Sequence, residues 1–183
     1  MSQLTILAIC GSLRAKSHNL TLLKYAQQVA PAGVEIVIAD LQQVPFFNAD
    51  LTEKPAAVQQ LLAQAARADA LLFACPEYNY SVAPALKNAL DWLSREPNNH
   101  LLAGKAAAIM GAGGGMGTSR AQYHLRQIGV YLDLHFVNKP EVFANAFAGT
   151  FAEDGGLTDV KIQAAIEQQI QALVTLASKV KAV

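Results

Sequence analysis

LTILAICGSLRAKSHN, residues 4–19, joins a run of seven mostly apolar residues to a short polar segment that begins with glycine. After Leu20 the chain returns to an apolar pattern with helical spacing, in which Leu22, Leu23 and Ala26 share one face. The sequence therefore predicts a buried strand, a polar turn and an amphipathic helix in succession. This unit is typical of α/β proteins, in which parallel strands alternate with helices.

The same alternation continues along the chain. Further apolar runs occur at 34–40, 68–75 and 105–112, with a weaker one at 133–137. Helical patterns lie between them at 19–30, 56–66, 84–95 and 118–132, and a last helix starts near residue 158. Continuous apolar runs suit parallel strands that are covered on both faces. We therefore predict a flavodoxin-like three-layer sandwich, a five-stranded parallel sheet with helices on both faces, which binds ligands at the carboxyl ends of its strands.

Size and composition limit the function. We expect the 183 residues to form a single domain, 1–183, with 42–55 and 138–157 as long connections within it. Fourteen basic and fourteen acidic residues cancel, which argues against nucleic acid or an anionic membrane as the partner. Neither a signal peptide nor a transmembrane run is recognisable, so we expect a cytoplasmic protein. Cys10 and Cys75 are expected to be buried core thiols.

The polar segment 11–19 follows the first predicted strand and opens the first predicted helix. Backbone N–H groups at a helix N-terminus favour anions, and Ser12 and Ser17 add hydroxyl donors there. Arg14 offers a fork for two phosphate oxygens, and Asn19 lies near the N-cap. We expect a phosphate site, with an ordinary polar turn capped by serine as the alternative.

Three known phosphate or signalling patterns do not fit this segment. Lys16 and Ser17 stand one place out of frame for a Walker A loop. Leu13 occupies the second glycine position of the dinucleotide fingerprint G-x-G-x-x-G. A receiver domain of the same topology would carry acids where this chain has Gly11 and Pro76. All three classes are therefore weakened.

Two more loops follow predicted strands. PEYNYS, 76–81, presents aromatic faces and backbone groups that suit a planar ring, although an aromatic turn buried under a neighbouring loop would have the same composition. GAGGGMG, 111–117, allows the backbone to approach a ligand closely, although a merely flexible turn is the alternative. We expect a ligand with an anionic end and a flat end.

Together these motifs resemble a known family. G-S-L-R-x-x-S-x-N after the first strand, P-E-Y-N-Y-S with A-L-K-N-A-L-D-W-L after the third, and R-A-Q-Y-H-L-R after the glycine loop are similar to the NADPH-dependent FMN reductases, particularly their quinone and chromate reductase members. The resemblance spans roughly residues 4 to 141. It implies that FMN is the cofactor and that NADPH or NADH donates the electrons.

The resemblance also implies a set of cofactor-binding residues. Ser12, Arg14, Ser17 and Asn19 would hold the FMN phosphate, residues 76–80 would line the isoalloxazine ring, and the loop 111–117 would close its other side. The full candidate set contains Ser12, Leu13, Arg14, Ser17, His18, Asn19, Pro76, Glu77, Tyr78, Asn79, Tyr80 and Gly113. We assign no catalytic side chain and no metal ligand, because the cofactor supplies the chemistry.

Two function classes remain open at this point. The first is an NAD(P)H-dependent FMN-containing oxidoreductase acting on quinones and, further, on chromate, azo compounds or free flavin. The second is a flavodoxin-type electron carrier that serves protein partners; such carriers are usually strongly acidic, whereas this chain is neutral. The resemblance further implies a homodimer or homotetramer, with Tyr80, Arg120, Tyr123 and Glu141 as candidate subunit contacts. Trp92 falls outside the apolar stripe of its predicted helix.

Overall fold

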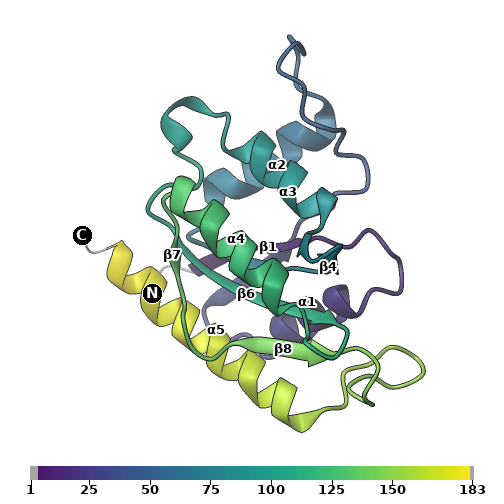
Figure 1. The fold of residues 1–183 in the computed structure, drawn as a ribbon. Coiled ribbons are helices and arrows are strands. Elements are labelled where there is room, and N and C mark those ends of the chain that lie inside the picture. The colour runs from purple at the N-terminus through teal and green to yellow at the C-terminus, as the bar shows by residue number, and fades with distance from the viewer. Residues whose placement is uncertain (1–3, 182–183) are drawn as a thin grey trace.

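A computed structural model describes residues 4–181 (Figure 1). The strands are β1 (Leu4–Cys10), β2 (Val34–Ile38), β3 (Ala70–Ala74), β4 (Glu77–Tyr78), β5 (Ser81–Val82), β6 (Ala106–Gly113), β7 (His135–Phe136) and β8 (Val142–Asn145). The helices are α1 (His18–Gln28), α2 (Ala56–Arg67), α3 (Pro84–Leu93), α4 (Ser119–Tyr131) and α5 (Val160–Val180), with a 3-10 turn, η1, at Pro97–Asn99.

The main sheet is parallel, with the strand order β2-β1-β3-β6-β7 and β8 also paired to β6. Neighbouring strands are in tight register, so that Ile6 of β1 faces Ile36 of β2 on one side and Ala70 of β3 on the other. Because β1 lies between β2 and β3, the strand order reverses beside it. Open α/β sheets bind ligands at such a point, at the carboxyl ends of the strands.

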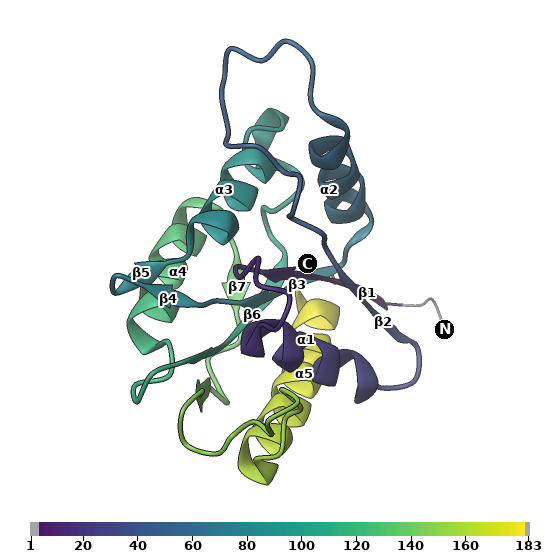
Figure 2. The same ribbon diagram turned by 90° about the vertical axis from the view of Figure 1, so that its right-hand side faces the viewer.

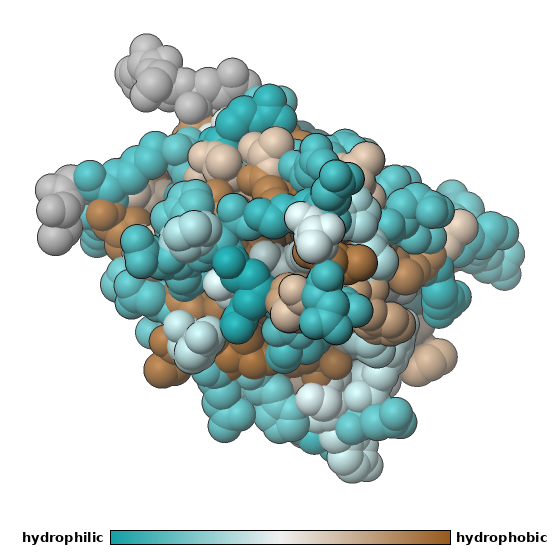
Figure 3. Space-filling view, turned by 90° about the horizontal axis from the view of Figure 1, so that it is seen from above, coloured by the Kyte–Doolittle hydropathy of each residue, from teal (hydrophilic) through white to brown (hydrophobic). Residues whose placement is uncertain are grey.

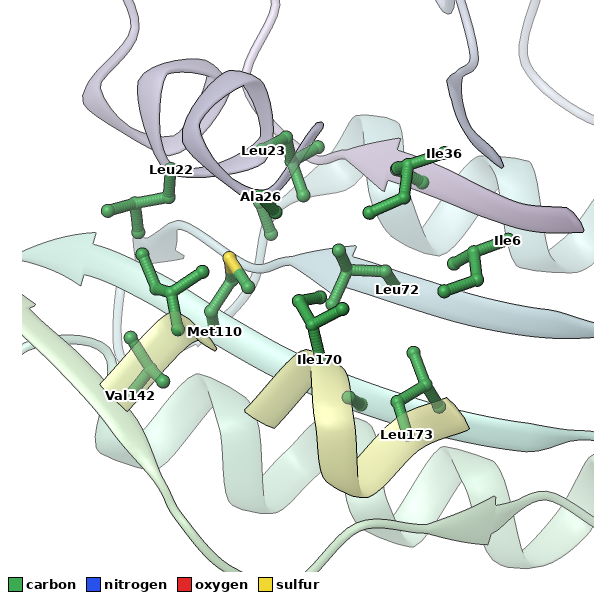
Figure 4. Close-up of a cluster of buried hydrophobic side chains, with 14 of the residues drawn as sticks. Ile6, Leu22, Leu23, Ala26, Ile36, Leu72, Met110, Val142, Ile170 and Leu173 are labelled. Carbon is green, nitrogen blue, oxygen red and sulfur yellow. The ribbon is translucent and has the colours of Figure 1, made fainter. Parts of the chain in front are cut away.

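Helices cover both faces of this sheet (Figures 1 and 2). Helices α1 and α5 pack on one face, where Leu22, Ile170 and Leu173 meet side chains of the strands (Figure 4). Helices α2, α3 and α4 pack on the other face through Leu61, Leu90 and their neighbours. Both faces of the central strands are therefore buried, which explains their continuous apolar runs. The prediction of a flavodoxin-like α/β sandwich is confirmed.

The last sheet position differs from the prediction. A single fifth strand at 133–137 was expected, but β7 covers only His135–Phe136 and pairs with the start of β6. Strand β8 then pairs with the carboxyl end of β6, from Met110 to Gly113. The sequence prediction of 138–157 as a connection is therefore wrong for Val142–Asn145. The three apolar residues of this four-residue strand, Val-Phe-Ala, are too few to separate it from a loop by sequence.

The connection 42–55 runs past α3 before it reaches α2 (Figure 2). Trp92 of α3 donates its indole N–H to the carbonyl of Pro45 at 2.8 Å, and its ring meets that of Phe47 edge to face. Trp92 is consequently buried by this connection, although it falls outside the apolar stripe of its helix. Hydrophilic residues cover most of the face seen from above, with hydrophobic residues scattered among them (Figure 3).

Candidate functional site

The start of α1 is built for an anion. Ser17 caps the helix, accepting from the N–H of Leu20 at 3.4 Å, so the remaining N–H groups of the first turn point out of the helix end. Ser12 and Ser17 are nearly buried, whereas Arg14 is exposed. Arg14 lines the same cavity as the first residues of α1, so its positive charge adds to that of the helix dipole there.

Asn19 connects this loop to the far side of the site. Its Nδ2 donates to the carbonyl of Ala112 at 2.9 Å, and its Oδ1 accepts from the N–H of Ala112 at 3.0 Å. Both residues are buried. The pair joins the first turn of α1 to the end of β6, where the glycine-rich loop begins.

The loop after β3 forms a two-stranded hairpin, β4–β5, which was not predicted from the sequence. Its turn residues Asn79 and Tyr80 have φ angles of 49° and 63°, as a two-residue turn of the favoured type requires. A tyrosine in this conformation is uncommon. The guanidinium of Arg120 lies 3.8 Å from the centre of the Tyr80 ring and so helps to hold it.

Glu77 fastens the hairpin to α4. Its carboxylate accepts from Arg120 Nε at 2.8 Å and Nη2 at 2.7 Å, and from the N–H of Ala121 at 3.2 Å. Ser81 Oγ and His124 Nδ1 are a further 3.0 Å pair between the same elements. Because the carboxylate of Glu77 is paired with a guanidinium, its charge opposes an anionic ligand less strongly.

The glycine-rich loop must pass close to its own backbone. A Cβ built on Gly113 would lie 2.3 Å from the carbonyl oxygen of Gly117, and one on Gly111 would lie 1.9 Å from Thr118 Oγ1. Any other residue at these positions would push the loop outward. The glycines therefore keep the end of β6 and the start of α4 together.

These three loops enclose one cavity of about 240 Å³, which we call the cradle. Nine of the twelve candidate residues line it: Ser12, Arg14, Ser17, His18, Asn19, Pro76, Glu77, Tyr78 and Gly113. Leu13 instead lines a neighbouring cavity, and Asn79 and Tyr80 form the exposed hairpin turn. Ala146 and Phe147 also line the cradle. They were not predicted, because they lie in the segment 138–157, which was expected to be a connection.

Two ionisable groups near the cradle have shifted acidities. Burial, followed by the positive charge of Arg14, lowers the pKa of His18 below its ordinary value. Burial raises the pKa of the Cys75 thiol to about 12, so this thiol stays protonated at neutral pH. The His18 ring stacks on Phe151 with centres 4.1 Å apart.

Within residues 4–181 there is no group of three His, Cys, Asp or Glu side chains that could hold a metal ion. None of the helices in this range has the length and apolar character of a membrane-spanning segment.

The residues present fit FMN. The α1 end of the cradle offers N–H groups, hydroxyls and a guanidinium to a phosphate, and the other end offers Pro76, Tyr78 and close-packed glycine backbone to a flat ring. This combination defines a flavodoxin-like flavin-binding protein.

Comparison with known proteins gives the family. Residues 4–149 match the NADPH-dependent FMN reductase family, and the chain belongs to it. It is 47% identical to an NAD(P)H:quinone oxidoreductase of Solanum tuberosum, over 96% of this chain and 94% of the relative. It is 48% identical to an NAD(P)H-dependent FMN reductase of Pseudomonas aeruginosa, with 92% of each chain covered.

A solved structure agrees with this assignment. The flavoenzyme NAD(P)H:(acceptor) oxidoreductase FerB from Paracoccus denitrificans superposes with a TM-score of 0.86 at 31% identity, covering 96% of this chain and 97% of that one. The predictions of an oxidoreductase, of FMN as cofactor and of NAD(P)H as electron donor are confirmed by these comparisons. They lend no support to the electron-carrier alternative.

Proposed function

We propose that this protein catalyses the reduction of quinones by NAD(P)H, with FMN held in the cradle. The observation that carries the proposal is the meeting of three strand-end loops at one cavity with an anionic-ligand end and a flat-ring end. Relatives of nearly equal length bear the name quinone oxidoreductase, which supports the choice of acceptor. Chromate, azo compounds and free flavin are further acceptors that we expect an open flavin site to reduce.

Each loop has a proposed task. Ser12, Arg14 and Ser17 bind the phosphate. Asn19 was expected to join them, but both polar atoms of its amide bind Ala112, so its task is to connect the phosphate loop to the glycine-rich loop. Pro76, Glu77, Tyr78 and Gly113 place the ring, and Asn79 and Tyr80 form the turn of the hairpin that carries Tyr78. FMN held by these residues would supply the hydride and electron chemistry between NAD(P)H and the acceptor, so the chain itself needs to bind and orient the reactants and needs no acid or base of its own.

We also propose a homodimer or homotetramer that forms through the outer face of α4 and the hairpin turn. Large apolar side chains are exposed there: Tyr80 at 66%, Tyr123 at 60% and Tyr131 at 74%. Glu141 is partly exposed and pairs with Lys139, so it can join a polar rim. Light scattering at micromolar concentration tests this; a monomeric mass would reject it.

We further propose that residues 1–183 act as one domain in the cytoplasm, where the two free thiols would stay reduced.

Steady-state kinetics tests the proposed activity. The FMN-loaded protein is mixed with NADPH or NADH, with and without a quinone, and nicotinamide oxidation is followed at 340 nm under nitrogen. We expect rapid oxidation that depends on the quinone. A rate equal to that of free FMN at the same concentration would contradict the proposal and would leave the protein as a carrier.

A further inference from the structure

The segment 146–157, which we call the strap, joins β8 to α5 at the same end of the sheet as the polar loop after β1 (Figure 1). We propose that the strap is a fourth wall of the FMN site and that Phe147 covers the ribityl chain of bound FMN. This inference rests on the proposed function, because it takes the cradle as the place that holds FMN.

Phe147 lines the cradle and is 86% exposed, more than any other large apolar side chain in the described part of the chain. Its N–H donates to Asn145 Oδ1 at 2.9 Å, so its backbone is held in a turn. A phenyl ring that is open to water at the edge of a cavity has apolar area to bury when a ligand enters. Because the backbone is already ordered, little order is lost when the ring packs against that ligand.

The strap reaches both ends of the cradle. At its start, the N–H of Ala146 donates to the carbonyl of Gly113 at 2.7 Å, and Gly113 belongs to the end that we assign to the ring. Farther on, the strap contacts α1, whose first turn belongs to the phosphate end. In FMN the ribityl chain joins the ring to the phosphate. Phe147 follows Ala146 directly, so the part of the cofactor that it can cover is this chain.

The rest of the strap is a compact hairpin. Phe151 and Leu157 form an antiparallel bridge, and both pack against the core beneath α1 and α5. Within the hairpin the N–H of Ala152 donates to the carbonyl of Gly156 at 2.8 Å, and the N–H of Gly155 donates to the carbonyl of Ala152 at 2.9 Å. The strap therefore has a fixed shape and can hold Phe147 in one place.

Two contacts tie this hairpin to the start of α1. The rings of His18 and Phe151 stack with their centres 4.1 Å apart and an angle of 5° between their planes. Thr21 Oγ1 donates to the carbonyl of Gly155 at 3.1 Å. His18 also lines the cradle, so the stack connects the strap to the loop that we expect to bind the phosphate.

The two phenylalanines therefore have different tasks. Phe147 touches the cofactor, whereas Phe151 is a positioning residue that acts through the strap. A side chain that covers a bound ligand mainly slows its departure, since most affinity differences between closely related complexes arise in the dissociation rate.

Phe147→Ala tests the cover without any turnover. Its matched control is Val160→Ala, because Val160 is 71% exposed on the first turn of α5 and is not among the described residues that line the cradle. Flavin fluorescence gives the Kd of FMN and of riboflavin, and the rate at which FMN leaves when holoenzyme is diluted. We expect Phe147→Ala to raise both Kd values about tenfold, with a matching rise in the FMN release rate. Val160→Ala should leave all three unchanged.

A double-mutant cycle tests the positioning role of Phe151. Phe151→Leu keeps an apolar side chain against the core but removes the stack on His18, and we expect the FMN Kd to rise about threefold. In the Phe147→Ala background the same change should have no further effect, because there is no cover left to position. If Phe151→Leu does not fold, Thr21→Val, which removes the bond to Gly155, takes its place in the cycle.

Four results would overturn the proposal. They are an unchanged FMN Kd in Phe147→Ala, a loss for FMN that riboflavin does not share, an altered absorption spectrum of the bound flavin, and a further rise in Kd when Phe151→Leu is added to Phe147→Ala. The second would place Phe147 on the phosphate, the third on the ring, and the fourth would mean that the stack acts through His18 alone.

The proposed function fails by different results, namely wild-type protein that binds no FMN or holoenzyme that shows no quinone-dependent NADPH oxidation. Both are measured on wild type, whereas the test of the strap compares variants with wild type. The two failures are therefore distinguishable.

Discussion

Asn19 and Ala112, ninety-three positions apart, exchange two hydrogen bonds through the side-chain amide of one and the backbone of the other. The bonds are 2.9 and 3.0 Å long, and both residues are buried. They join the start of α1 to the end of β6, which are the two loops on opposite sides of the cradle. Asn19 therefore adds a polar connection between the two sides of the cradle to the apolar packing of α1 against β6.

Asn19→Ala removes both bonds and leaves the buried N–H of Ala112 without that partner. We expect the free energy of unfolding of the apoprotein to fall by about 1–3 kcal/mol, measured in urea. FMN affinity should fall as well. Gln27→Ala, which removes one bond to the carbonyl of Ile36 at the other end of α1, is the control and should spare FMN affinity. Equal losses of FMN affinity in the two variants would show that Asn19 has no special place in the cradle.

Gly113→Ala tests the close approach of the glycine-rich loop. The new Cβ would lie 2.3 Å from the Gly117 carbonyl oxygen, so the loop must move, at a cost of about 1–3 kcal/mol in unfolding free energy. FMN binding, followed by quenching of its fluorescence, should weaken. Gly115→Ala meets no atom within 4 Å and should change neither quantity. A Gly113→Ala variant as stable as wild type would refute this account of the loop.

Arg120→Ala tests the attachment of the hairpin to α4. In this variant Glu77, whose side chain is only 9% exposed, loses the cation that pairs with it. We expect the free energy of unfolding to fall by about 1–2 kcal/mol, and not by more, because Arg120 itself is partly solvated. Lys87→Ala is the control: it breaks an exposed ion pair with Asp91, one turn away on α3, and should lower the free energy of unfolding by about 0.3–0.5 kcal/mol. Chemical denaturation measures the free energy of unfolding of both variants. Equal losses in Arg120→Ala and Lys87→Ala would show that the Glu77–Arg120 pair does not fasten the hairpin.

His18 makes the stability of the apoprotein depend on pH. Its pKa is lowered below 6.5 in the folded chain, so near that pH the unfolded chain binds the proton more readily. Stability should therefore fall as the pH drops from about 6.5 towards the folded pKa. Removing the charge in Arg14→Ala should raise the pKa of His18, measured by NMR titration. No change, or a further fall, would mean that Arg14 does not act on this ring.

Most of the fold could be predicted because its information is local. Continuous apolar runs of five to eight residues mark β1, β3 and β6, and stripes such as Leu22, Leu23 and Ala26 mark the helices. Strand β8 and the hairpin β4–β5 could not be predicted, because strands of two to four residues are too short to show a hydrophobic period. The hairpin turn also lacks glycine, the usual signal, and Tyr80 adopts its conformation beside Arg120 from a distant helix.

That several of the candidate residues lie together could be predicted for a similar reason. Loops that follow strands of a parallel sheet must end at one edge, so residues 11–19, 76–78 and 113 could be grouped before any contact was known. The two hydrogen bonds between Asn19 and Ala112, and those that hold Pro45 and Phe47 to Asn88, depend on contacts between distant segments. Hydrogen bonds from side chains to distant backbone have no sequence pattern. Nothing in the sequence therefore indicated that Asn88 and Trp92 bind the backbone of Pro45 and Phe47.

The most direct test of the whole account compares FMN and riboflavin binding to wild type and Arg14→Ala. If the loop 11–19 holds the flavin phosphate, loss of the guanidinium removes a charge-assisted contact and FMN binds about tenfold to more than a hundredfold more weakly. Arg14 is exposed, so the apoprotein should remain as stable as wild type. Riboflavin, which lacks the phosphate, should bind both proteins equally. Unchanged FMN affinity, or an equal drop for riboflavin and FMN, would contradict the central claim that this loop recognises the phosphate.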